Sequence, residues 1–269
     1  MSRFSDFLRQ AKNTSCSVVV VAAGASTRMG EDKLFMDLSG MPVLARTLTA
    51  LNRCGCVDEI VVVTRLESLE KTAALCREYR ITKAGKVIVG GATNYTAALH
   101  LMRTGAAGVL VGFGGGAVSG TLNTIGLQAP MATAIADVAE ARRDYMDESG
   151  GRYVQLIADG GMGSSGNFIK AFAMGADAVM LGSPLARAVE APGHGMHWGA
   201  EARHQSLPRG KRTNVGTVAP LQEILYGPSH QADGTTNFIG ALRRAMASTG
   251  YVDVKNFQRC SVVVTSTVK

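Results

Sequence analysis

The fold is decided by the stretch YVQLIADGGMGSSGNFIKAFAMGADAVMLGS at residues 153–183. Its first six residues are mostly apolar and predict a buried strand, and a glycine-rich turn follows them. Residues 167–174 have helical spacing, and residues 178–181 predict a second buried strand. A strand, a helix and a strand in this order form a right-handed crossover between parallel strands. The stretch therefore predicts a parallel α/β sheet.

The same alternation extends toward both ends of the chain. Further strands are predicted at residues 17–22, 59–64, 87–89 and 108–111. Helices are predicted at residues 42–52, 69–79, 96–103, 131–145, 238–248 and 254–258. The total is about six parallel strands, whereas a closed (β/α) barrel needs eight. We therefore expect an open or partly closed sheet, together with a functional flap or a disordered segment between residues 192 and 234.

Composition narrows the functional class. The chain has 269 residues, of which 46% are hydrophobic and 18% charged, with a formal net charge of +7. Its longest strongly apolar run, residues 18–23, is far shorter than the roughly 20 residues that a bilayer requires. No secretory leader is recognised, so we expect a cytoplasmic protein without a membrane partner. The positive charge has no long basic run, so it suits a phosphorylated small molecule at least as well as nucleic acid, and we expect no nucleic-acid partner.

The five cysteines are odd in number and lack CxxC spacing. In a cytosolic chain this pattern indicates thiols and predicts no metal site.

Three predicted strands end in glycine-rich loops. The loops read VGFGGGAVSG (residues 111–120), IADGGMGSSG (157–166) and MLGS (180–183). The carboxyl ends of parallel strands lie on one side of a sheet, where α/β proteins bind their ligands. Glycines allow backbone amides to reach a phosphate, and Asp159 is placed to accept hydrogen bonds from a ribose diol. The loops therefore predict a nucleotide site.

The chain from about residue 87 to its end resembles the IMP dehydrogenase and GMP reductase family, particularly its actinobacterial IMP dehydrogenase-related members. The resemblance rests on AALHLMRTGAAGVLVGFGGG (97–116), MATAIADVAEARRDYMDESGGRYVQLIADGGMG (131–163) and GADAVMLGSPLARAVEAPG (175–193). It implies the second half of a TIM barrel and a flap around His197 that meets the base. It also implies nucleotide-binding roles for Gly112, Gly114, Gly116, Asp159, Gly160, Gly161, Gly182 and Ser183. NAD(P) and a monovalent cation are compatible with it as cofactors.

Ser119 stands where the dehydrogenases of this family carry the cysteine that attacks C2 of the purine. A serine hydroxyl without a recognisable activating base is a poor substitute for a thiolate. The resemblance therefore gives Ser119 the catalytic position and predicts impaired or no catalysis.

The front of the chain carries a different pattern. VVVVAAGASTRMGEDKLFMDLSGMPVLARTLTAL (18–51), CVDEIVVVT (56–64) and VIVGGAT (87–93) resemble 2-C-methyl-D-erythritol 4-phosphate cytidylyltransferase. The resemblance implies a nucleotidyltransferase-like, Rossmann-like segment with Mg²⁺ as cofactor. It makes Gly24, Ser26, Arg28, Gly30 and Lys33 candidates for binding CTP. Asn94 and Ala97 depart from that family's usual Arg and Ser, and its later segment with the metal-binding Asp is missing from this chain.

These resemblances predict two segments that meet at the strand of residues 87–89. Residues 1–91 would be a cytidylyltransferase-like segment, and residues 92–269 a half barrel with flap and C-terminal helices. Three functions stay open: a purine nucleotide-binding protein with impaired or no catalysis, a cytidylyltransferase of isoprenoid synthesis, and an inactive chimeric scaffold. A homo-oligomer is compatible with each.

Overall fold

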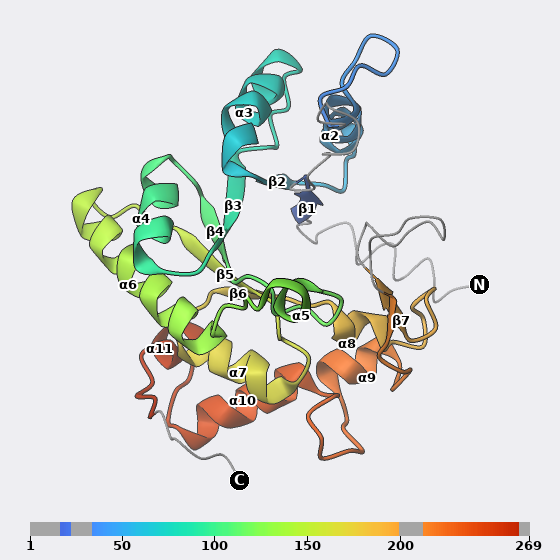
Figure 1. The fold of residues 1–269 in the computed structure, drawn as a ribbon, viewed down its shortest axis with the longest axis vertical. Coiled ribbons are helices and arrows are strands. Elements are labelled where there is room, and N and C mark those ends of the chain that lie inside the picture. The colour runs from blue at the N-terminus through green and yellow to red at the C-terminus, as the bar shows by residue number, and fades with distance from the viewer. Residues whose placement is uncertain (1–16, 23–33, 199–211, 264–269) are drawn as a thin grey trace. The chain divides into compact units, whose positions relative to one another are not determined.

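The computed structural model describes residues 17–22, 34–198 and 212–263 (Figure 1). The chain divides into two compact units. Unit 1 comprises residues 1–90 and 106–108, and unit 2 comprises residues 91–105 and 109–269. This division is geometric, and the family boundary that the sequence predicts at residue 91 stays a prediction.

Six strands form one sheet in which they follow one another in chain order. The pairs β1–β2, β2–β3 and β5–β6 are parallel. The strands are β1 (Ser17–Val21), β2 (Glu59–Thr64), β3 (Lys86–Ala92), β4 (Gly108–Val111), β5 (Gln155–Asp159) and β6 (Ala178–Met180). The predicted six-stranded parallel α/β sheet is thus confirmed.

Helices connect these strands and follow the last of them. The sequence predicts α2 (Val43–Arg53), α3 (Leu69–Glu78), α4 (Tyr95–Arg103), α6 (Met131–Glu148), α7 (Ser165–Ala173), α10 (Phe238–Ser248) and α11 (Val254–Phe257). It does not predict the short helices η2 (Leu66–Ser68), α5 (Thr121–Ile125), α8 (Ser183–Ala186) and α9 (Leu221–Tyr226). Within the described ranges, no helix is both long and apolar enough to cross a membrane.

Unit 1 has its core on one face of α2. Leu44 and Leu48 are four residues apart, so they share a helix face, and both are buried. They belong to the same buried cluster as Ile60 and Val62 of β2. Burying each of these side chains contributes about 1.5 to 3 kcal/mol, so this apolar face fixes α2 in unit 1.

Unit 2 has a second core, between α7 and α10. Phe238 begins α10 and is fully buried, and its ring lies 5.4 Å from that of Phe168 in an edge-to-face contact. Phe172, one turn further along α7, makes a similar contact with Phe168 at 5.1 Å. Figure 1 shows α7 and α10 side by side below β5 and β6. The aromatic cluster therefore attaches the C-terminal helices to the second half of the sheet.

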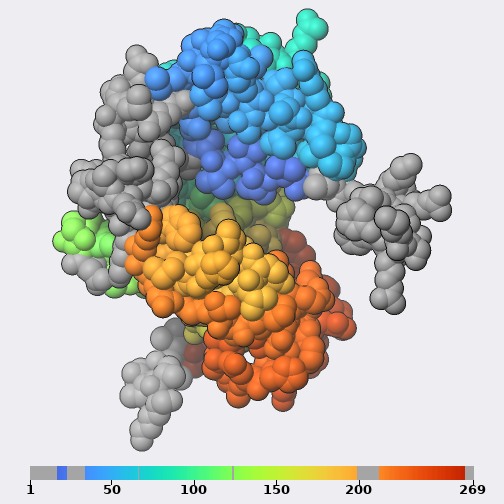
Figure 2. All heavy atoms as spheres, turned by 90° about the vertical axis from the view of Figure 1, so that its right-hand side faces the viewer, coloured from blue at the N-terminus to red at the C-terminus, as the bar shows by residue number. Residues whose placement is uncertain are grey.

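The predicted flap segment contains an antiparallel hairpin. Its strands are β7 (Met196–Trp198) and β8 (Arg212–Asn214), with His197 opposite Thr213. The flap and the C-terminal helices of unit 2 appear in orange and red in the space-filling view, where they lie against one another (Figure 2). In the part of the flap that the structure describes, β7 and β8 are therefore paired as antiparallel strands.

A buried polar cluster joins the loop before β6 to three other parts of unit 2. The carboxylate of Asp177 lies 2.7 Å from Arg142 of α6, and both side chains are less than 10% exposed. It also accepts hydrogen bonds from Tyr153 and from Lys255 of α11. Burial alone would raise the pKa of Asp177, but the hydrogen bonds from Lys255, Tyr153 and a backbone amide outweigh it and lower the pKa.

We expect Asp177→Asn to lower the free energy of unfolding by about 3 to 5 kcal/mol, because Arg142 would stay buried without its counter-charge. Since the folded-state pKa of Asp177 is depressed, its contribution is present above the unfolded pKa of about 3.9 and is lost as the pH falls through the folded value. Urea denaturation between pH 3 and pH 7 measures both effects.

The exposed pair of Arg103 and Glu148, also in unit 2, provides a control. Glu148→Gln should change the free energy of unfolding by less than about 1 kcal/mol. Equal effects of the two substitutions would contradict a special role for Asp177.

Candidate functional site

The ends of β3, β4 and β5 approach one another so closely that glycine is required. A Cβ atom on Gly91 would lie 2.2 Å from the carbonyl oxygen of Gly112, and a Cβ on Gly112 would lie 2.2 Å from that of Asp159. Gly112 also has a φ of +131°, a conformation that side chains disfavour. The close backbone contact therefore sets where Asp159 stands.

The loops after β4 and β5 also pack against each other. Gly160 has a φ of +112°, and a Cβ there would lie 3.2 Å from the Cα atom of Gly115. Gly114 has a φ of +75°, and a Cβ atom there would lie 2.6 Å from the carbonyl oxygen of Leu127. The two predicted ligand loops are therefore neighbours in unit 2.

A cavity of about 430 Å³ opens between these loops and the loop after β6. Six of the predicted nucleotide-binding residues line it: Gly116, Asp159, Gly160, Gly161, Gly182 and Ser183. The other two, Gly112 and Gly114, stand in the close backbone approaches described above. The structure thus brings the predicted residues together, whereas their role in binding stays a prediction.

Asp159 is the last residue of β5 and lines the cavity half-buried. Burial raises the pKa of its carboxyl group. An ionised carboxylate accepts hydrogen bonds, so this residue can receive two hydroxyl donors from a ligand in the cavity.

The flap hairpin contributes His197 to the same cavity. Its Nδ1 atom lies 3.3 Å from the hydroxyl of Ser183. Burial lowers the pKa of His197, so the neutral imidazole is favoured at neutral pH. Thr213 of β8 donates a hydrogen bond to the carbonyl oxygen of Ala117, which ties the hairpin to the loop after β4.

Arg187 also lines the cavity, although no motif in the sequence marks it. Its guanidinium donates to the carbonyl oxygens of Gly163 and Val215, at 3.0 and 3.2 Å. It therefore joins the loop after β5 to the flap residue that follows β8, and it brings a positive charge to the cavity. The one available signal was its position four residues after Ser183, which is one helical turn.

Ser119, the predicted catalytic residue, is held near the start of α5. Its hydroxyl contacts that of Thr121 at 3.1 Å and accepts a hydrogen bond from the Thr121 amide. Among the described residues that line the cavity, the loop after β4 contributes residues 115–118 and does not contribute Ser119. Ser119 thus stabilises the loop through Thr121. This geometry does not support its predicted catalytic role.

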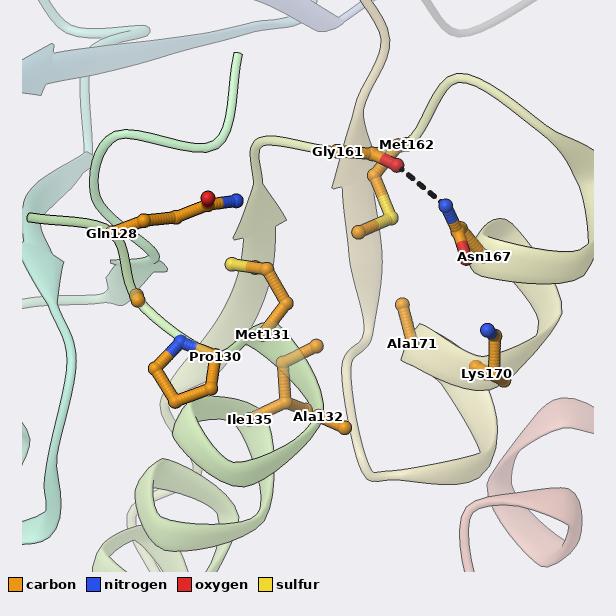
Figure 3. A pocket seen from close by; sticks show the side chains of 11 residues that line it. Gln128, Pro130, Met131, Ala132, Ile135, Gly161, Met162, Asn167, Lys170 and Ala171 are labelled. Atoms are coloured by element: carbon orange, nitrogen blue, oxygen red, sulfur yellow. Dashed lines mark hydrogen bonds between the residues drawn. The ribbon is translucent and has the colours of Figure 1, made fainter. Parts of the chain in front are cut away.

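A second cavity, of about 470 Å³, lies between the first turns of α6 and α7 (Figure 3). Met131 and Ile135 face it from α6, and Lys170 and Asn167 from α7. Asn167 donates a hydrogen bond to the carbonyl oxygen of Gly161, so one loop separates the two cavities. Although this cavity is slightly larger, no carboxylate lines it among the described residues. The first cavity is therefore the better nucleotide candidate.

The candidate CTP loop cannot be placed in the same way. Gly24, Ser26, Arg28, Gly30 and Lys33 lie outside the described residues.

Comparison with known proteins identifies the family. Residues 44–212 match the IMP dehydrogenase / GMP reductase domain. This range covers more than half of the chain, so the chain belongs to that family. It begins within the segment that resembles a cytidylyltransferase, and the comparisons support neither that assignment nor a chimera of two families.

Individual relatives agree with this assignment. The chain is 53% identical over 231 residues to an uncharacterized oxidoreductase of Mycobacterium leprae. This match covers 83% of this chain and 62% of the relative. It is 40% identical over 171 residues to the inosine-5′-monophosphate dehydrogenase of Thermoplasma acidophilum, covering 64% of this chain and 34% of the relative. The chain thus spans less than two thirds of the length of these two relatives.

A solved structure has a similar fold. The crystal structure of an IMP dehydrogenase/GMP reductase-like protein from Corynebacterium glutamicum matches with a TM-score of 0.67 and 38% identity, covering 92% of this chain and 78% of that one. The fold is therefore related to the TIM barrel of this family, with six sheet strands described here.

We expect Gly112→Ala to destabilise unit 2 by about 3 kcal/mol, because the new methyl group would clash with the carbonyl of Asp159 in a disfavoured conformation. Gly116→Ala is the matched control, since a Cβ there meets no atom within 4 Å. It should change stability by less than about 1 kcal/mol. Thermal unfolding measures both, and a neutral Gly112→Ala would contradict the close approach.

Proposed function

We propose that the cavity formed by the three glycine loops binds a purine nucleoside 5′-monophosphate. The observation that carries this proposal is that Asp159, Gly161, Gly182 and Ser183 line one cavity in a member of the IMP dehydrogenase / GMP reductase family. A carboxylate beside glycine amides suits a molecule that has a diol at one end and a phosphate at the other.

The phosphate would be held by backbone amides and by Arg187. Gly160 and Gly161 are consecutive residues with positive φ, of +112° and +77°. Turns with left-handed residues can direct consecutive amides toward one anion. The guanidinium of Arg187 adds a charge that favours a phosphate over a neutral group.

The ribose would be held by Asp159. Its position at the end of β5 is fixed by the backbone contact with Gly112. Because the pKa of Asp159 is raised, acidification should protonate it sooner than an exposed aspartate and weaken its interaction with the diol.

Among the residues that the structure describes, those around the cavity do not fit the cysteine-dependent redox chemistry. That chemistry needs a strong nucleophile next to the purine, and Ser119 instead contacts Thr121. We therefore propose nucleotide binding with impaired or no catalysis, and we derive no hydride transfer to NAD(P). A monovalent cation stays part of what the family resemblance implies, and we derive no step through it.

Calorimetric titration with IMP, GMP, CTP and inorganic phosphate tests the proposal. We expect purine monophosphates to bind with a dissociation constant on the order of 0.1 to 1 mM, or about 4 to 5.5 kcal/mol. Asp159→Ala should weaken their binding about tenfold and leave phosphate binding nearly unchanged, since only the nucleotide has a diol.

Asp144→Ala is the matched control, because Asp144 is an exposed acid of α6 whose carboxylate contacts Tyr95. It should leave all four titrations unchanged. Equal losses for nucleotide and phosphate in Asp159→Ala would mean that Asp159 only supports the loop. Preferential binding of CTP would favour the cytidylyltransferase alternative, and rapid IMP-dependent formation of NADH would refute impaired catalysis.

A further inference from the structure

Two cysteines in unit 1 lie in contact outside the proposed nucleotide site. Cys54 and Cys56 flank Gly55 in the turn between α2 and β2, and their sulfur atoms are 3.1 Å apart. Cys54 is half-buried and Cys56 is exposed, so reagents in solution can reach the pair.

The turn holds the two side chains together. The amide of Cys54 donates to the carbonyl oxygen of Leu51 and ends α2, while the amide of Val57 donates to the carbonyl oxygen of Cys54. Val57 is buried in the core of unit 1, which anchors the far side of the turn. Both sulfur atoms are therefore positioned by backbone hydrogen bonds and packing.

The surroundings favour a thiolate at Cys54. The hydrogen bond from Cys56 lowers the pKa of Cys54, and the charge of Lys83 lowers it further. The ammonium of Lys83 is fixed nearby by a 2.9 Å hydrogen bond to the carbonyl oxygen of Cys54. A lowered pKa increases the fraction of thiolate, which is the nucleophile in disulfide chemistry.

Metal binding is a weaker interpretation of the pair. A tetrahedral zinc site uses three or four protein ligands. In the part of the chain that the structure describes, no group of three His, Cys, Asp or Glu side chains could hold a metal ion. A disulfide, in contrast, needs only these two side chains in a suitable geometry, and their sulfur atoms already lie within 3.1 Å of each other.

We propose that Cys54 and Cys56 are a thiol–disulfide exchange pair that reacts with low-molecular-weight disulfides of the glutathione type. The Cys54 thiolate attacks one sulfur of the external disulfide, whose S–S bond breaks and releases one thiolate. Cys56 then loses its proton and attacks Cys54 Sγ, which releases the second thiolate. The protein loses two hydrogens, and the external disulfide becomes two thiols.

Peptide mass spectrometry of the whole protein tests this exchange. The protein is treated with glutathione disulfide, quenched with acid, alkylated with N-ethylmaleimide and digested with trypsin. Cleavage after Arg53 and Arg65 places both cysteines in one peptide, CGCVDEIVVVTR. We expect this peptide to lose two hydrogens and to take up neither glutathione nor maleimide, and to regain two thiols with dithiothreitol.

Cys76 is the internal control. It is a half-buried cysteine of α3 in the same unit, and burial raises its pKa. Its thiol should react with glutathione disulfide at least about tenfold more slowly than the pair. Its peptide, TAALCR, should therefore be recovered with maleimide attached.

Two variants separate the steps. In Cys56→Ser the reaction should stop at a stable mixed disulfide between Cys54 and glutathione. In Cys76→Ser the oxidation of the pair should be unchanged. The proposal is overturned if the wild-type peptide takes up two glutathiones, if it stays doubly alkylated, or if Cys76 reacts as fast as the pair. These wild-type results do not depend on the folding of either variant.

Discussion

The candidate site depends on the close backbone contact between Gly91, Gly112 and Asp159. Neither glycine can carry a side chain, because a Cβ atom on each would lie 2.2 Å from a carbonyl oxygen of the next strand end. This contact fixes the spacing of the ends of β3, β4 and β5. It places Asp159 at the cavity and lets the loops after β4 and β5 lie against each other.

Other parts of unit 2 hold this arrangement in place from outside the sheet. The aromatic cluster of Phe168, Phe172 and Phe238 attaches α10 to α7, the helix that follows the loop after β5. Arg187 links that loop to Val215, the flap residue that follows β8. The cavity is therefore supported by segments that are far apart in the sequence but share one structural unit.

The sequence predicts the strands and long helices because each has a local pattern of apolar residues that become buried. Examples are residues 59–64 of β2 and the pair Leu44 and Leu48 of α2. It predicts the glycine loops because glycine and aspartate occur where strands end. It misses the β7–β8 hairpin, because strands of three residues are too short for an alternating pattern to be recognised. It also misses Arg187, whose partners lie 24 and 28 residues away. The sequence of residues 18–93 resembles a cytidylyltransferase because a β-branched strand followed by a glycine loop occurs in many α/β folds. That pattern alone does not distinguish one family from another.

A crystal structure of the protein with bound IMP tests whether the three glycine loops form the nucleotide site. We predict that the phosphate lies against the amides of Gly161, Gly182 and Ser183, and that the ribose hydroxyls donate hydrogen bonds to Asp159. The strand ends should hold the same close contact between Gly112 and Asp159. IMP bound elsewhere, or a cavity left empty at millimolar IMP, would contradict it.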